Sequence, residues 1–255
     1  MLQLKTPAQV MIMREAGRVV AQALDAVRRE AKVGVTLREL DQVAAAVIKS
    51  AGARPAFLGY HPPWAESPYP GVICASVNDT VVHGVPGHRR LRDGDLVSID
   101  CGAFVDGWCG DSAVSFIVGT VDPADTALVE AADVALARAI NAAQPGAQLG
   151  DVGHAIAAAA RRAGYGLLAD HGGHGVGRAM HEDPFVPNEG RPGHGHRLRP
   201  GLVIAIEPMV IGDGTDAYLK DSDGWALRTA TGARAAHSEH TVAITEEGPL
   251  VLTAL

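Results

Sequence analysis

The sequence predicts an α/β fold of two similar halves, each with two helices followed by strands, around a central antiparallel sheet. Helix and strand patterns run along the chain in two successive rounds. Residues 91–100 (LRDGDLVSID) match residues 198–207 (LRPGLVIAIE) without a gap, at an offset of 107 residues. Residues 33–40 match residues 145–152 at an offset of 112. An internal duplication of about 110 residues explains both offsets. Because each matched strand ends in an acidic residue, we expect one central site between the halves.

Composition narrows the class of protein. The chain has 255 residues, of which 47% are hydrophobic and 20% charged, which is typical of a globular protein. The net charge of -7, without a cluster of Lys or Arg, argues against nucleic-acid specificity. Three cysteines without a CxxC pair argue against a disulfide scaffold and a thiolate zinc site. With no apolar run suited to a signal peptide or a membrane span, we expect a cytoplasmic protein.

The four expected helices come in two pairs. Residues 7–31 follow Thr6, a favourable N-cap, and residues 36–52 begin at Thr36 with Glu39 three positions on, which is a capping box. The segments that follow are a proline-rich irregular loop (53–70) and three strands (72–76, 96–104 and 108–118). The second round is expected to have helices over 123–143 and 148–163 and strands over 202–206 and 240–245. We expect one domain over 1–255, with halves of about 1–120 and 121–255.

A hairpin brings two aspartates together. The Asp106-Gly107 pair is a strong two-residue turn signal between apolar runs. The register that this turn sets makes Asp100 and Asp111 diagonal neighbours on one face of the sheet. Two carboxylates in an apolar sheet would repel each other unless cations lay between them, and a pair of divalent ions satisfies this condition. The alternative is that both aspartates lie at a solvated end of the sheet.

Three further segments offer metal ligands. Residues 171–184 contain three histidines and four glycines, among them His174 and His181. Glu207 ends an apolar strand, where an unpaired carboxylate would be costly. Glu239 opens the last long strand, where an ordinary charge on an edge strand is the alternative. Carboxylates with an imidazole suit Mn(II), Fe(II), Co(II) or Zn(II), and bridging carboxylates hold ion pairs that supply a hydroxide nucleophile. Neither a phosphate-binding GxxxxGK[ST] loop nor a GxSxG elbow is present.

The chain resembles the type I methionine aminopeptidases over nearly its whole length. The resemblance rests on the ordered motifs SIDCG, CGDSA, GGHGVG, IEPM and SEHT, and on VVHGVP at residues 81–86. It implies the duplicated pita-bread fold, with a dimetal site between the halves. It also implies hydrolytic removal of the N-terminal methionine from nascent polypeptides whose second residue is small, with a bridging hydroxide as nucleophile.

The resemblance also implies individual roles. Asp111 and Glu239 would bridge two divalent ions (Co, Mn, Fe, Zn or Ni), Asp100 would be a further ligand, and His174 and Glu207 would bind one of the ions. Glu207 would also move the proton of the attacking water. His83 and His181 would contact the scissile peptide. The methionine pocket would be lined by Tyr60, Tyr69, Cys74, His83, Met180, His181 and Trp225. A monomer with a transient contact to the ribosome is the expected state.

Three features depart from the family pattern. The segment 61–70 (HPPWAESPYP) is longer than usual, Phe57 replaces a small residue or Cys, and His-Ser precedes Glu239 where an aromatic residue is commoner. These departures concern the shape of the pocket and the choice of substrate, since all five ligands are intact. We expect neither the zinc-binding extension of eukaryotic type I enzymes nor the insertion that marks type II.

Two other functions fit the same fold. An Xaa-Pro aminopeptidase or dipeptidase usually carries a large N-terminal domain, for which 255 residues leave no room. A pita-bread protein that has lost its metals could act as a binding module, but such relatives usually lack at least one ligand. Metal-dependent release of methionine from a Met-Ala-Ser peptide would separate the aminopeptidase from both alternatives.

Overall fold

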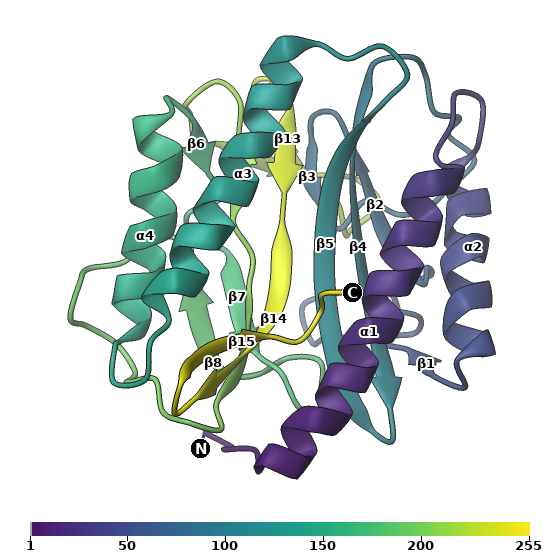
Figure 1. The fold of residues 1–255 in the computed structure, drawn as a ribbon. Coiled ribbons are helices and arrows are strands. Elements are labelled where there is room, and N and C mark those ends of the chain that lie inside the picture. The colour runs from purple at the N-terminus through teal and green to yellow at the C-terminus, as the bar shows by residue number, and fades with distance from the viewer. Residues whose placement is uncertain (1) are drawn as a thin grey trace.

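The computed structural model describes residues 2–255 as a mixed α/β fold, with a curled antiparallel sheet covered by four helices (Figure 1). One helix pair lies on each side of the long strand β14 in this view. The helices are α1 (Pro7–Glu30), α2 (Leu37–Ser50), α3 (Pro123–Ala142) and α4 (Leu149–Arg162). The strands of the main sheet are β1 (Arg54–Pro55), β2 (Ile73–Val77), β4 (Asp95–Val105), β5 (Trp108–Val118), β7 (Gly172–Gly175), β8 (Glu182–Pro187), β9 (Val203–Ile206), β14 (Glu239–Thr245) and β15 (Gly248–Val251). Two three-stranded sheets hold β3 (Thr80–Val82), β6 (Gly166–Leu167), β10 (Met209–Ile211), β11 (Tyr218–Lys220), β12 (Leu227–Thr229) and β13 (Ala235–His237).

Local capping starts the first helix pair where the sequence predicts. The hydroxyl of Thr6 accepts a hydrogen bond from the Gln9 amide, and the Gln9 side chain accepts one from the Thr6 amide. The Thr36 amide donates to the Glu39 carboxylate in the same way at the start of α2. Each reciprocal pair satisfies two donors that an uncapped helix would leave unpaired. Both predicted N-termini are therefore confirmed.

The β4–β5 hairpin confirms the predicted register. Asp106 and Gly107 have φ angles of 50° and 75°, the left-handed conformation that a tight two-residue turn requires. Val105 consequently pairs with Trp108 across the turn. Further along the hairpin Asp100 faces Ala113 and Gly102 faces Asp111, so the two carboxylates lie diagonally on one face.

The two halves repeat the same backbone pairing at the offsets found in the sequence. In each half the loop before the second helix bonds to the residues that lead into the matched strand. The amide of Gly34 donates to the carbonyl of Leu91 at 2.8 Å, and the amide of Gly146 donates to the carbonyl of Leu198 at 2.8 Å. The isolated bridges Thr36–Arg90 and Gln148–Arg197 repeat in the same way. The duplication is thus a property of the fold as well as of the sequence.

Alternation along the strands separates a helix-covered face from a face that holds the candidate site. Ile99 and Cys101 of β4 pack in the cluster formed with α1 and α2. Ile204 and Ile206 of β9 pack in the cluster formed with α3 and α4. Because successive side chains point to opposite faces, Asp100 projects away from the helices.

Several short strands were not predicted. The proline-rich segment, predicted as an irregular loop, contributes β1, and the segment around His174 contributes β7 and β8. Strand β1 is held by pairing with the distant β4, and β7 pairs with its neighbour β8 and at Gly175 with β9, which a local pattern does not reveal. No helix in the described part of the chain is long and apolar enough to cross a membrane.

Candidate functional site

A row of residues across four strands forms the first part of the site. Ala113 of β5 pairs with Asp100 of β4 on one side and with Glu239 of β14 on the other. Cys74 of β2 pairs with Asp100 from the outer side. Directly opposed residues share a face, so the small Ala113 side chain leaves space between two carboxylates.

Asp111 lies in the next row. It faces Gly102, whose missing side chain matters because a Cβ there would lie 2.9 Å from Phe57 and 3.2 Å from the Asp111 carboxylate. The Thr241 hydroxyl accepts a hydrogen bond from the Asp111 amide and donates one to its carbonyl. These contacts fix the Asp111 backbone and direct its carboxylate into the site.

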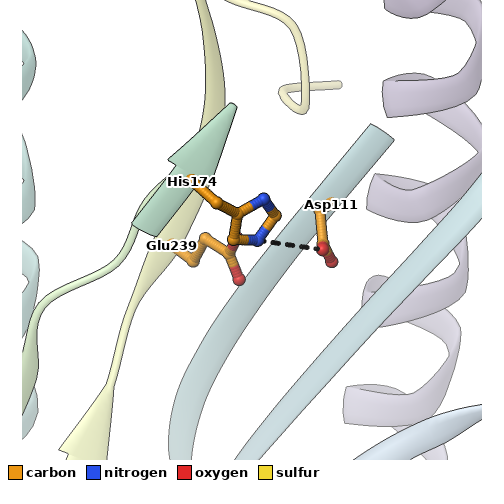
Figure 2. Close-up of side chains that lie close together, drawn as sticks. All are labelled: Asp111, His174 and Glu239. Carbon is orange, nitrogen blue, oxygen red and sulfur yellow. Dashed lines mark ion pairs between the residues drawn. The ribbon is translucent and has the colours of Figure 1, made fainter. Parts of the chain in front are cut away.

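His174 completes the central group (Figure 2). Its Nε2 lies 3.9 Å from Asp111 Oδ2 and 3.7 Å from Glu207 Oε1. Figure 2 shows His174, Asp111 and Glu239 pointing toward one another from three different strands. The Nδ1 atom of His174 lies 2.9 Å from the Gly175 carbonyl, so it is the nitrogen that carries the proton. The Nε2 lone pair therefore faces the carboxylates and is available to a cation.

Burial sets the electrostatics of the four carboxyl groups. It raises the pKa of Asp100 and of Glu207 to about 7 each. It also raises the pKa of Asp111 and Glu239 well above their usual values, with the charges of neighbouring carboxylates adding to the effect. A positive charge among them would relieve both penalties. The predicted alternatives of a solvated sheet end and an edge-strand charge are wrong, since Asp111 and Glu239 are 3% and 2% exposed.

The donor set fits divalent metal ions. Oxygens of Asp100, Asp111 and Glu239 are buried without a hydrogen-bond partner among the described residues. Two groups of potential ligand atoms lie within 4.8 Å of one another: Asp111 with His174 and Glu239, and Glu207 with His237 and Glu239. Orphaned buried acceptors of this kind are rare in native proteins unless an ion satisfies them. Oxygen donors with imidazole suit borderline and hard divalent cations.

Two further histidines border the carboxylates. His83 has a φ of 60°, which is uncommon for a residue with a side chain and is often found at functional sites. Burial lowers the pKa of His83 to about 4, so its ring is neutral at pH 7. The ring of His181 stacks on Tyr60 at 5.2 Å and lies 4.0 Å from the ring of His174. Although His181 lies at the exposed mouth of the site, desolvation and the neighbouring His174 lower its pKa.

An aromatic cavity of about 330 Å³ adjoins the carboxylates. Tyr69 is held by hydrogen bonds from its hydroxyl to the carbonyls of Ile73 and Gly84, and its ring meets Trp225 at 5.0 Å. All the residues predicted for the site line this one cavity: Tyr60, Tyr69, Cys74, His83, Asp100, Asp111, His174, Met180, His181, Glu207, Trp225 and Glu239.

Other residues of the cavity were not among the predicted site residues. Phe57 and Trp64 line it; Trp64 belongs to the long segment 61–70, and Phe57 is a separate departure from the family pattern. His171 lies in the glycine-rich segment, where the cluster of histidines was a usable signal. Met209 follows the IEP motif without any distinguishing pattern. His237 is not among the residues that line the cavity but lies beside it, with its Nε2 3.4 Å from Glu207 Oε2; in the sequence it is only a departure from the family pattern.

Comparisons with known proteins agree with this geometry. The model of metallopeptidase family M24 matches residues 11–246. Methionine aminopeptidase 1 of Mycobacterium tuberculosis is 50% identical over 248 residues, covering 94% of this chain and 91% of that protein. The crystal structure of a methionine aminopeptidase from Thermotoga maritima has a TM-score of 0.95 at 41% identity and covers both chains fully.

The Xaa-Pro peptidases share the fold at greater distance. A prolidase from Pyrococcus furiosus is 25% identical with a TM-score of 0.76, and this chain covers 65% of its length. The methionine aminopeptidases match in sequence, in structure and in length. The chain therefore belongs to metallopeptidase family M24, among its type I methionine aminopeptidases.

Proposed function

We propose that this protein removes the N-terminal methionine from peptides and nascent polypeptides whose second residue is small. The observation that carries the proposal is that five side chains of metal-ligand type share one cavity with an apolar aromatic slot. A methionine side chain is long, unbranched and polarizable, and it packs well against aromatic rings and another sulfur. Tyr69, Trp225 and Met180 supply such a lining.

We propose two divalent ions in the centre, since their charge balances the four carboxylates Asp100, Asp111, Glu207 and Glu239. Asp111 and Glu239 would bridge the ions, Asp100 would bind one, and His174 with Glu207 would bind the other. Such ions, when bound, lower the pKa of water and polarise the scissile carbonyl. The metal-addition experiment described below decides among Co, Mn, Fe, Zn and Ni.

The protein groups around the centre would act on protons and on the peptide. Glu207, whose carboxylate lies beside His174 in the centre, would take a proton from the attacking water and pass it to the leaving amine. Neutral His83 and His181 would donate hydrogen bonds to the scissile peptide and to the negative charge that develops on its oxygen. The slot of Tyr60, Tyr69, Cys74, Met180 and Trp225 would hold the methionine side chain.

The proposal also includes the domain organisation, the compartment and the oligomeric state of the enzyme. Residues 1–255 would act as one catalytic domain, with the centre between halves of about 1–120 and 121–255. The substrate is the N-terminus of a new polypeptide, so the enzyme would work in the cytoplasm as a monomer in transient contact with the ribosome.

The test is a set of peptides with metals added back singly to chelator-treated protein. We expect kcat/KM on Met-Ala-Ser to exceed that on Leu-Ala-Ser by about 10–200-fold. A difference of one methylene group in the side chain that fills an apolar slot changes kcat/KM by that factor. Met-Lys-Ser should be rejected, since space for the second residue is tight near His83. A preference for Ala-Pro-Ser would identify an Xaa-Pro peptidase instead, and no hydrolysis with any metal would favour a binding module.

A further inference from the structure

A second buried imidazole lies among the carboxylates, on the side of Glu207 opposite His174. His237 is 2% exposed, and its Nε2 lies 3.4 Å from Glu207 Oε2. His174 Nε2 lies 3.7 Å from the other oxygen, Glu207 Oε1. The two rings thus flank one carboxylate at similar distances.

The Nε2 atom of His237 has no hydrogen-bond partner within residues 2–255. A hydrogen bond to Glu207 would be the simplest use of this nitrogen, but the contact does not meet the geometry of one. A separation of 3.4 Å suits two donors that bind the same cation, since metal–ligand distances of about 2.0–2.1 Å at a tetrahedral angle place donors that far apart.

Hydrogen bonds hold the backbone of His237 and of the residue after it. Ser115 Oγ accepts from the His237 amide at 3.0 Å and donates to the His237 carbonyl at 2.8 Å. The next residue, Ser238, donates from its amide to the Pro208 carbonyl and from its hydroxyl to Asp133. With its backbone held on both sides and its side chain 2% exposed, His237 loses little further entropy when it binds a ligand, which favours a preorganised donor.

We propose that His237 is a metal ligand of this centre: its Nε2 binds an ion together with carboxylate oxygens of Glu207 and Glu239. The atoms of these three residues already lie within 4.8 Å of one another. The inference rests on the proposed metal centre and adds a second imidazole to it. Imidazole suits Zn, Fe, Co and Ni better than Mn or Mg, so His237 shifts the preference of the centre toward the former ions.

The test counts imidazole ligands in the Co(II)-loaded protein. In its ¹H NMR spectrum, the ring N–H of each coordinated histidine gives a strongly shifted resonance that disappears in D₂O. We expect two such resonances in the parent protein and one in His237→Gln. The matched control is His240→Gln, which removes a neighbouring histidine that contacts Ser112 and Thr253 on the other face, and it should retain both resonances.

Metal titration gives a second readout. Affinity for Co(II) should fall by about tenfold or more in His237→Gln, and affinity for Mn(II) should fall less. One resonance in the parent protein, or two in a folded His237→Gln protein, would overturn the ligand role; the parent count alone decides if the variant does not fold.

Hydrolysis of Met-Ala-Ser by the parent protein keeps the two proposals apart. If it proceeds while only one resonance is present, only the second imidazole is refuted. If two resonances are present without hydrolysis, the centre stands and the peptidase function fails.

Discussion

Each carboxylate of the centre acquires its chemistry from its position in the sheet. Asp111 and Glu239 are ordinary acids in sequence, yet they are 3% and 2% exposed and lie among other carboxylates. Burial and like charge both disfavour ionisation, and a cation offsets both effects at once. The same burial keeps His83 neutral, so it can donate a hydrogen bond without adding charge.

Removing a bridging carboxylate should abolish turnover. We expect Asp111→Asn and Glu239→Gln to lose both metal and activity, because each neutral amide removes an anion that two cations would share in the proposed centre. Metal content by atomic emission and kcat on Met-Ala-Ser measure the two effects. Near-normal turnover with full metal occupancy in either variant would rule out the two-metal centre.

The two histidines that are proposed to contact the scissile peptide should behave differently from the bridging carboxylates. His83→Ala and His181→Ala should keep their metal and lose about 10²–10³-fold in kcat, the typical cost of one donor to a developing negative charge. The same metal analysis is the control. A variant that loses metal before it loses rate would show that the histidine is a ligand.

At the scale of elements, the loop between β1 and β2 shapes the entrance of the pocket. Trp64 in this loop is 54% exposed, yet it lines the cavity, meets Trp225 edge-on at 5.1 Å and stacks over His83 at 6.4 Å. The Nζ atom of Lys220 lies over the Trp64 ring, 5.5 Å from its centroid. The long segment noted in the sequence therefore adds an aromatic wall beside the residue that is expected to contact the scissile peptide.

Truncating this wall should widen the choice of second residue. We expect Trp64→Ala to raise the ratio of kcat/KM on Met-Leu-Ser to that on Met-Ala-Ser by about tenfold or more, the scale of steric discrimination in an apolar pocket. Leu58→Ala is the matched control, because Leu58 is 53% exposed in the same loop and does not line the cavity. An unchanged ratio would place the second residue away from Trp64.

At the scale of the whole molecule, the centre links folding to metal and to pH. Strands from both halves carry its acids, so the central sheet can form only when these carboxyl groups are brought together. In metal-free protein the pKa of Asp100 rises from 3.8 to about 7 on folding. The folded state then binds more protons than the unfolded state between these values, and stability falls as pH rises through this range.

Chelator-treated protein should therefore melt at a lower temperature at about pH 8 than at about pH 5.5. Metal-loaded protein should show the opposite trend, since ions bind the ionised carboxylates and compete with protons. Differential scanning calorimetry at the two pH values measures how the melting temperature changes with pH, with and without metal. In the metal-free protein, Asp100→Asn should reduce this change. Parallel slopes with and without metal would contradict the link between the centre and folding.

Turn and capping signals in the sequence correctly predicted the structural features that depend on residues close together in the chain. The Asp106-Gly107 turn sets the β4–β5 register, and the capping residues Thr6 and Thr36 set two helix starts. The repeat offsets predicted a duplicated fold. The short strands β7 and β8 were missed because the glycines of β7 and the prolines of β8 are poor strand formers, and the two strands are held by pairing with each other and with β9. The ligand motifs were found because Asp, His and Glu are unusual within apolar strands, as for Asp100 and Asp111, and at their ends, as for Glu207 and Glu239.

What the sequence determined by itself is the alternation of apolar and acidic residues, the turn and caps that align them, and the repetition of this pattern. What only the tertiary structure decided is which distant side chains share a cavity and which way they point. His237 illustrates the difference. The place of its backbone beside Glu207 depends on hydrogen bonds with Ser115, which is 122 positions away. Such contacts follow from the curling of the sheet and from side-chain packing, for which no local pattern in the chain is sufficient.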